Sequence, residues 1–309
     1  MKNTLSEELL SSLTADTPSI SPKFFYDDIG SRLFDVITLL NEYYPTRTEK
    51  WIMDAYQGDI AAAVGHCDVL VDLGAGNCAK ASRLFETLNP RQYRALDISK
   101  EYLEVAVADL QKQFPQIEMS AHAVDLSLPM AFPDIQELDK VFFYPGSSIG
   151  NFDPEQADEF FVNLANECHG KGGLLIGVDL VKDVETLNLA YNDSLGVTAA
   201  FNLNTLLNVN RLIGSNFQPQ DWEHYAFFNT SQSRIEMHLR ALKDVQITLP
   251  GHKGHDHLIS FGAGNLIHTE NSYKYTQDHF VEKLRCAGFK DIHCWTDPNK
   301  HFLVCFAKT

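Results

Sequence analysis

The hydrophobic pattern of residues 68–180 is typical of a parallel α/β sheet. Apolar runs of strand length recur there, and segments with helical spacing separate them. The strands predicted in this way are 69–73, 93–98, 117–124, 140–144 and 172–178, and the helices between them are 79–88, 100–114 and 156–168. The first run carries apolar residues at odd and even positions, which suits a strand covered on both faces. The succession predicts a doubly wound α/β sheet.

The alternation of predicted strands and helices stops between about residues 183 and 262, a segment rich in Asn and aromatic residues. This segment can hold several strands, and residues 234–242 alternate polar and apolar as a half-exposed strand does. Beyond it we predict a helix over 276–287 and two strands over 289–296 and 301–307, joined by a turn. A terminal antiparallel pair is unlike a plain dinucleotide-binding domain. We interpret the middle segment as an inserted subdomain.

Charge and cysteine usage narrow the class of protein. The chain has 309 residues and a formal net charge of −16, which argues against binding nucleic acid or an anionic membrane. We expect no membrane span, and no secretory signal in residues 1–16. Residues 1–20 are expected to form a partly ordered lead-in. The six cysteines contain no Cys-x-x-Cys pair, so we expect a reducing cytoplasm.

Polar residues and glycines stand where three predicted strands end, the place where open α/β sheets bind nucleotide-like ligands. Gly74 and Gly76 follow the first strand and permit a tight turn close to a ligand. Asp97 ends the second strand, where a carboxylate can bridge two ribose hydroxyls, and Asp125 follows the third, where it can accept from an adenine amine. The alternative is that both acids cap the helices that follow.

Two cofactors fit this pattern, NAD and S-adenosylmethionine (SAM). The third glycine expected for a dinucleotide pyrophosphate is missing, although Ala79 can stand in its place. Asp72, just before the glycines, places a negative charge near a sulfonium, which a pyrophosphate would disfavour. Together with the terminal strand pair, this favours SAM.

Five segments carry a resemblance to a known family, namely 26–31, 42–49, 146–152, 196–202 and 267–274. From about residue 20 to the end, the chain resembles the L-histidine Nα-methyltransferases of ergothioneine biosynthesis. The resemblance implies a class I SAM-dependent methyltransferase core, a Rossmann-like seven-stranded sheet, with a smaller substrate-binding domain. It also implies three successive methylations of the α-amine of histidine, giving hercynine.

The resemblance implies a division of the chain and a set of site residues. The segments are an N-terminal helical part of the substrate domain over 1–60, the core over 61–190, an inserted substrate-binding subdomain over 191–262, and the end of the core over 263–309. The implied cofactor contacts are Gly74, Lys80, Asp97, Asp125 and Leu126, with Gly76 added from the turn. The implied substrate contacts are Tyr43, Asn151, Tyr191, Met237, Glu270 and Ser272, with Tyr26 near the reacting amine.

Methyl transfer from a sulfonium requires a neutral amine, held at both ends of the amino acid. Asn151 and Tyr191 can donate to the substrate carboxylate, while Glu270 can accept from an imidazole N–H and Ser272 can serve the other ring nitrogen. Tyrosine rings suit a methylated ammonium. We expect the Tyr26 phenol oxygen, or a water that it relays, to remove the proton.

Other interpretations stay open at this point. One is an enzyme of the same fold that methylates another amino acid such as tryptophan. Glu270 and Met237 are the positions that would distinguish histidine from that substrate. A catalytically inactive SAM-binding module and an NAD dehydrogenase are the others. The cluster of His252, His255 and His257 fits a surface loop better than a metal site, so we predict no metal. We expect a monomer that binds a small molecule.

Overall fold

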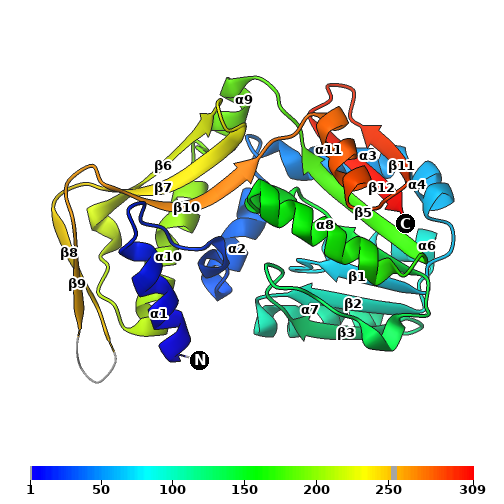
Figure 1. The fold of residues 1–309 in the computed structure, drawn as a ribbon, viewed down its shortest axis with the longest axis horizontal. Coiled ribbons are helices and arrows are strands. Elements are labelled where there is room, and N and C mark those ends of the chain that lie inside the picture. The colour runs from blue at the N-terminus through cyan, green and yellow to red at the C-terminus, as the bar shows by residue number, and fades with distance from the viewer. Residues whose placement is uncertain (1, 252–255) are drawn as a thin grey trace. The chain divides into compact units, whose positions relative to one another are not determined.

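The computed structural model describes residues 2–251 and 256–309 and divides the chain into two units (Figure 1). Unit 1 consists of Met1–Tyr43 and Asp183–Ser272, and unit 2 of Tyr44–Lys182 and Tyr273–Thr309. The segments expected from the sequence differ from these units in three places. Residues 44–60, expected with the N-terminal segment, belong to unit 2. Residues 183–190 and 263–272, both expected with the core, belong to unit 1.

Unit 2 is built on a seven-stranded sheet with the strand order β11-β12-β5-β4-β1-β2-β3. Its strands are β1 (Val69–Leu73), β2 (Gln92–Asp97), β3 (Glu118–Ala123), β4 (Lys140–Tyr144), β5 (Gly172–Asp179), β11 (Asp291–Thr296) and β12 (Phe302–Lys308). The first five pair in parallel, whereas β12 is antiparallel to both β5 and β11. The predicted seven-stranded sheet, parallel except for a terminal antiparallel pair, is confirmed.

Helices cover both faces of this sheet, as the apolar character of β1 and β4 requires. They are α3 (Tyr44–Ala55), α4 (Gln57–Val64), α5 (Ala79–Ser82), α6 (Phe85–Leu88), α7 (Lys100–Gln113), α8 (Pro154–Cys168) and α11 (Gln277–Cys286), with the 3₁₀ turns η2 (Pro133–Ile135) and η3 (Ser148–Asn151). Side chains of α8 and α11 pack with Val71 on one face, and those of α3, α4 and α7 pack with Leu70 on the other.

The helix predicted over 79–88 is divided into α5 and α6. The Leu84 N–H bonds to the Ala81 carbonyl three residues back, which tightens the turn between the two helices. Leu84 and the following Phe85 are both buried against the sheet as a result.

Unit 1 contains a three-stranded sheet with the order β10-β7-β6 and a separate two-stranded hairpin. Its strands are β6 (Trp222–Asn229), β7 (Arg234–Ala241) and β10 (Leu266–Tyr273), with β8 (Val245–Leu249) and β9 (His257–Phe261) in the hairpin. Its helices are α1 (Lys2–Leu13), α2 (Asp28–Ile37), α9 (Val184–Leu189) and α10 (Val197–Ile213), with η1 (Pro22–Phe25) and η4 (Pro219–Asp221). The strand predicted over 234–242 corresponds to β7, but the expectation that it is half-exposed is wrong. Six of its eight residues are buried, because the polar Glu236 and His238 are buried along with the apolar positions.

Two helices of unit 1 depart from the sequence prediction. The expected partly ordered lead-in is the helix α1, whose Leu9 and Leu13 are buried in the core of the unit. The segment expected to hold strands contains α10, which spans 17 residues. Four asparagines in α10 weaken its helical signal, because Asn hydrogen-bonds readily outside helices.

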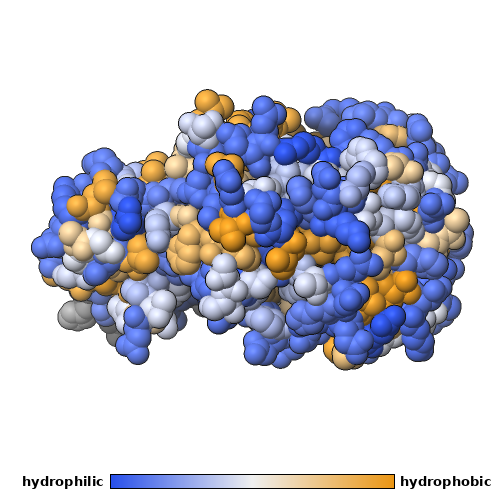
Figure 2. Space-filling model, turned by 90° about the horizontal axis from the view of Figure 1, so that it is seen from above, coloured by the Kyte–Doolittle hydropathy of each residue, from blue (hydrophilic) through white to orange (hydrophobic). Residues whose placement is uncertain are grey.

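The surface is polar in keeping with the acidic composition. On the face that Figure 2 shows, hydrophilic residues predominate and apolar residues are scattered among them. Single exposed apolar side chains are ordinary on a folded protein, and Leu39, which is 82 % exposed, is an example in this chain. Over the described ranges, no helix has the length and apolar character needed to cross a bilayer.

Candidate active site

The loop after β1 adopts a backbone that favours glycine. Gly74 has a φ of 72° and Gly76 a φ of 52°, both in the left-handed region. The Gly74 N–H donates to the Leu96 carbonyl oxygen at 2.8 Å, and the Gly76 N–H donates to Asp97 Oδ2 at 2.9 Å. A Cβ on Gly76 would meet no atom within 4 Å. Conformation therefore favours glycine at this position, and the space beside its Cα is open.

Two carboxylates stand at the ends of β2 and β3. Asp97 Oδ1 accepts from the Ser99 N–H at 2.9 Å, while its other oxygen accepts from Gly76. Asp125 Oδ1 accepts from the N–H and the hydroxyl of Ser127 at 3.0 and 2.5 Å. The N-cap of α7 is Ser99, and no α-helix begins directly after Asp125. The helix-capping alternative is therefore wrong for both acids. Leu126, next in the chain, lies against Gly74.

Lys80, on α5, is linked to the turn after β4. Its Nζ lies 2.7 Å from Glu49 Oε2, and Glu49 Oε1 accepts from the Gly146 N–H at 2.7 Å. A Cβ on Gly146 would lie 2.8 Å from Lys80 Nζ, and the φ of Gly146 is 81°. Glu49 is 4 % exposed. The sequence prediction assigned Glu49 no role, although the motif 42–49 ends on it.

The environment of Asp72 does not match the role that the sequence suggested, a negative charge beside the cofactor. It is 1 % exposed, and the Tyr93 hydroxyl donates to its Oδ2 at 2.7 Å. Burial raises the pKa of Asp72 to about 7, although the Tyr93 hydrogen bond opposes this shift. Burial therefore opposes the negative charge that the sequence suggested beside a sulfonium.

Three of the predicted tyrosines of unit 1 lie in one row of aromatic rings. The ring centroids of Tyr26 and Phe34 are 5.9 Å apart, those of Phe34 and Tyr43 are 6.2 Å apart, and those of Tyr43 and Tyr191 are 6.3 Å apart. Each pair meets edge to face, the arrangement that aromatic quadrupoles favour. Phe34 and Phe201, which also packs on Tyr26, were not predicted. Phe34 has no feature in the sequence that separates it from core phenylalanines, whereas Phe201 stands in the motif 196–202 and could have been found from it.

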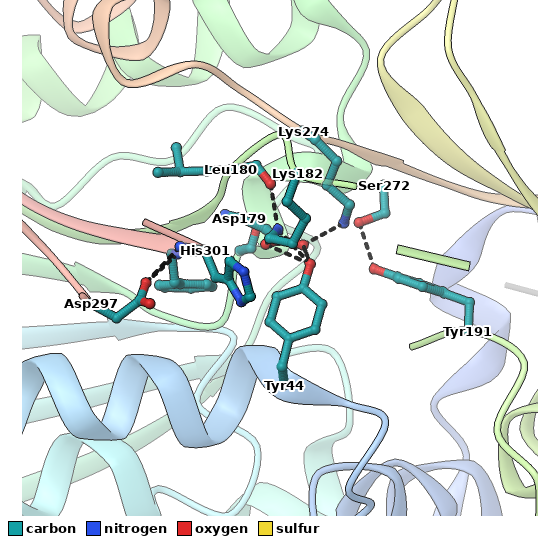
Figure 3. Close-up of polar contacts among 11 residues, drawn as sticks. Tyr44, Asp179, Leu180, Lys182, Tyr191, Ser272, Lys274, Asp297 and His301 are labelled. Carbon is teal, nitrogen blue, oxygen red and sulfur yellow. Dashed lines mark hydrogen bonds and ion pairs between the residues drawn. The ribbon is translucent and has the colours of Figure 1, made fainter. Parts of the chain in front are cut away.

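Glu270 and Ser272 lie two residues apart on β10, so their side chains point to the same face of the strand. They are 7 % and 4 % exposed, respectively. The Tyr191 hydroxyl donates to Ser272 Oγ at 2.8 Å (Figure 3). Met237, 1 % exposed, is on the neighbouring strand β7. The fold thus brings predicted residues from distant parts of the sequence into one unit.

Asn151 belongs to unit 2, unlike the other predicted substrate contacts. It is the last residue of η3, whose N-cap Ser147 has a φ of 66°. The Asp179 N–H donates to Ser147 Oγ at 2.9 Å and fixes the start of this turn.

A buried polar cluster in unit 2 was not predicted. Asp179 is fully buried, and the Tyr44 hydroxyl lies 2.8 and 2.6 Å from its two oxygens (Figure 3). Lys182 Nζ lies 2.6 Å from Asp179 Oδ1, and Lys274 Nζ lies 2.9 Å from Oδ2. Burial opposes ionisation of Asp179, but the two ammonium groups outweigh it and hold its pKa below the usual value. Burial lowers the pKa of Lys182 to about 8.

One group of side chains among the described residues could hold a metal ion, formed by His66, Asp68 and Asp139. It precedes β1 and β4 and so lies at the opposite end of these strands from the glycine loop. Of the histidine cluster considered from the sequence, His252 and His255 lie outside the described residues.

Comparison with known proteins identifies the family. The model of a family described as "histidine-specific methyltransferase, SAM-dependent" matches residues 5–309. The chain is 38 % identical over 303 residues to a histidine N-alpha-methyltransferase of Mycolicibacterium smegmatis, covering 96 % of this chain and 92 % of that protein. It is 34 % identical over 306 residues to the protein of the same name from Mycobacterium tuberculosis, with coverage of 96 % and 92 %.

A third relative is longer than this chain. The match to ergothioneine biosynthesis protein 1 of Neurospora crassa is 29 % identical over 297 residues and covers 92 % of this chain but 32 % of that protein. The family model spans almost all of the chain, and the first two relatives match it nearly end to end. This chain therefore belongs to the family of histidine-specific, SAM-dependent methyltransferases.

Proposed function

We propose that this enzyme transfers three methyl groups in succession from SAM to the α-amine of L-histidine, forming hercynine. The observation that carries the proposal is the buried pair Glu270 and Ser272 on one face of β10, beside Tyr191. Neutral imidazole offers one donor and one acceptor, which this pair complements. An apolar side chain would leave the Glu270 carboxylate without that partner, at a cost of roughly 1–3 kcal/mol.

The hydrogen-bond directions support this assignment. Tyr191 donates to Ser272 Oγ, and we assign the Ser272 hydroxyl as the donor to the unprotonated nitrogen of the ring. Glu270 then accepts from the ring N–H. Tyr191 has a single hydroxyl proton, so donation to the substrate carboxylate would replace its bond to Ser272. Asn151 can donate to that carboxylate through its amide.

The loop of unit 2 suits the cofactor. Gly76 leaves the approach to the backbone open, and the Asp97 oxygens retain lone pairs for ribose hydroxyls. Asp125 is proposed to accept from the adenine amine, while Leu126 and Lys80 supply an apolar and a cationic contact. When bound, SAM supplies the electrophilic methyl carbon.

The amine must lose its proton before each transfer. We assign this step to the Tyr26 phenol oxygen, directly or through a water. The proton would pass from the ammonium nitrogen to the deprotonated Tyr26 oxygen or to a water. The freed lone pair would then form the new N–C bond while the bond between the methyl carbon and sulfur breaks, leaving the sulfur as a neutral thioether. Tyr26 and Tyr43 belong to one row of rings, and aromatic faces attract the alkylated ammonium of the product.

The proposal is tested by incubating the enzyme with SAM and a mixture of the twenty amino acids, followed by mass spectrometry. We expect histidine alone to gain one, two and then three methyl groups. Methylation of tryptophan or another amino acid instead would overturn the substrate assignment. Accumulation of monomethylhistidine as the final product would overturn the trimethylation.

We also propose that the enzyme acts as a monomer in the cytoplasm. Its six cysteines are free, which accords with a reducing compartment. Light scattering on the purified enzyme at several concentrations tests the oligomeric state, and a constant mass equal to one chain is expected. Cell fractionation tests the compartment.

A further inference from the structure

Asp179 is the centre of a buried polar cluster that the chemistry proposed above does not use. Its carboxylate lies within hydrogen-bonding distance of the Tyr44 hydroxyl and the ammonium groups of Lys182 and Lys274. The side chains of these two lysines are 4 % and 1 % exposed. Burying charges is expensive, and such clusters often contribute little to stability compared with apolar packing. The cluster is therefore better explained by a role in positioning neighbouring chain segments than by a contribution to stability.

The groups bound by Asp179 lie close in sequence to predicted substrate contacts. Tyr44 directly follows Tyr43, and Lys274 is two residues beyond Ser272. The Asp179 N–H binds Ser147, the N-cap of the turn that ends at Asn151. One residue thus contacts three chain segments that each carry a group proposed to hold histidine.

These contacts also coincide with the places where the chain passes from one unit to the other. The unit boundaries fall between residues 43 and 44, 182 and 183, and 272 and 273. Each boundary is within two residues of a side chain that binds Asp179, namely Tyr44, Lys182 and Lys274. In the described structure, Asp179 therefore fixes the unit 2 end of all three connections.

We propose that Asp179 is a positioning residue for the amino acid substrate, acting through Tyr44, Lys274 and Ser147 on the segments that carry Tyr43, Ser272 and Asn151. The inference rests on the function proposed above. Small displacements of groups that orient a substrate reduce the rate strongly. The side chains and N–H group joined to Asp179 do not include the predicted cofactor contacts Gly74, Gly76, Lys80, Asp97, Asp125 and Leu126. Ser147 is the contact of Asp179 nearest the cofactor set, because the neighbouring Gly146 binds Glu49, the partner of Lys80. We therefore expect Tyr44→Phe and Asp179→Asn to separate an effect on histidine from one on SAM most cleanly.

The test measures histidine KM, kcat and the SAM dissociation constant for three variants. Tyr44→Phe and Ser147→Ala each remove one hydroxyl and leave the buried charges in place, while Asp179→Asn removes the central charge. We expect histidine KM to rise about tenfold in Tyr44→Phe and Asp179→Asn. SAM affinity should stay within about twofold. Glu137→Gln, which removes an exposed partner of Lys171, is the control and should match wild type.

A double variant separates a shared network from independent defects. If Asp179 acts through Tyr44, Tyr44→Phe combined with Asp179→Asn should raise KM no further than the more severe single variant. Unchanged histidine KM in Tyr44→Phe and Ser147→Ala overturns the inference, and so does an equal loss of SAM affinity. If Asp179→Asn does not fold, the two hydroxyl variants decide. Failure of the proposed function would show differently, as absence of histidine turnover in the wild-type enzyme.

Discussion

At the scale of single residues, several polar groups in and around the candidate site have little exposure. Glu49, Asp179, Glu270 and Ser272 are all less than a tenth exposed. Buried polar groups are costly unless paired, so their removal has effects that depend on which partner is left behind. Conservative substitutions that remove one partner at a time can therefore test each proposed role separately.

Replacing Tyr26 by Phe removes the phenol oxygen and keeps the ring in contact with Phe34 and Phe201. We expect kcat to fall about a hundredfold or more, as for the loss of a general base. The pH dependence of kcat should change its shape as well. Tyr56→Phe, in unit 2, is the matched control. A wild-type rate and pH profile for Tyr26→Phe would show that another group takes the proton.

Replacing Glu270 by Gln preserves shape and removes the charged acceptor for the imidazole N–H. We expect histidine KM to rise roughly tenfold to a hundredfold, because a hydrogen bond to a buried charge contributes about 1–3 kcal/mol. Steady-state kinetics with varied histidine measures the change. The exposed Glu185→Gln serves as control. An unchanged KM would place the imidazole elsewhere.

At the scale of elements, α10 shows how tertiary contacts stabilise a helix of modest propensity. Its asparagines are used by the rest of unit 1. Asn204 Nδ2 donates to Asp27 Oδ1 at 2.8 Å, and Asn208 Nδ2 donates to the Phe24 carbonyl at 2.7 Å. These bonds join α10 to the segment before α2, which also carries Tyr26. The helix thus supports the row of aromatic rings.

Asn208→Ala should destabilise the enzyme by about 1–3 kcal/mol, because the buried Phe24 carbonyl loses its donor. Chemical denaturation measures this through the midpoint at constant slope. The same substitution at Asn166, an exposed residue of α8, should be neutral or slightly stabilising, since Ala is the better helix former. Equal stability of the Asn208 variant and wild type would contradict this account of α10.

At the scale of the whole molecule, the candidate residues are distributed between the two units. The cofactor set lies on unit 2, and the tyrosine row with the β10 pair lies on unit 1. Stability of the molecule also depends on buried titratable groups in both units. His238 and Asp72 change the pH dependence of stability in opposite directions.

Burial lowers the pKa of His238 from 6.5 to about 4, and nearby His268 adds to the shift. Its contribution to stability is therefore present above about pH 6.5 and lost as the pH falls toward 4. The raised pKa of Asp72 acts in reverse, since its contribution is present below pH 3.8 and lost as the pH rises toward 7.

Comparing wild type with His238→Gln isolates the histidine, because Asp72 is common to both proteins. We expect the unfolding free energy of wild type to fall more steeply between about pH 6.5 and 4 than that of the variant. Denaturation at a series of pH values provides the measurement. Parallel curves would mean that His238 does not titrate in this window.

The hydrophobic pattern along the sequence predicted helices and strands correctly where they alternate regularly. The strands of unit 2 alternate with helices, and each β1 residue is buried, so the apolar runs marked the sheet directly. In unit 1 the same approach missed α10, whose asparagines resemble a loop until their partners are in place. At the site, the motifs named Tyr26, Tyr43 and Glu270 but not Asp179, which is one acid at the end of a buried strand.

The sequence by itself determined the parallel sheet, its terminal antiparallel pair and the glycine loop, because period and turn chemistry are local properties. It also determined the family, through motifs spread over the chain. Tertiary structure alone decided that Tyr191 donates to Ser272 and that Glu49 joins Lys80 to Gly146. It also decided that Asp179 contacts two lysines and a tyrosine. These contacts join residues far apart along the chain, and no local periodicity encodes which distant polar groups will be buried together.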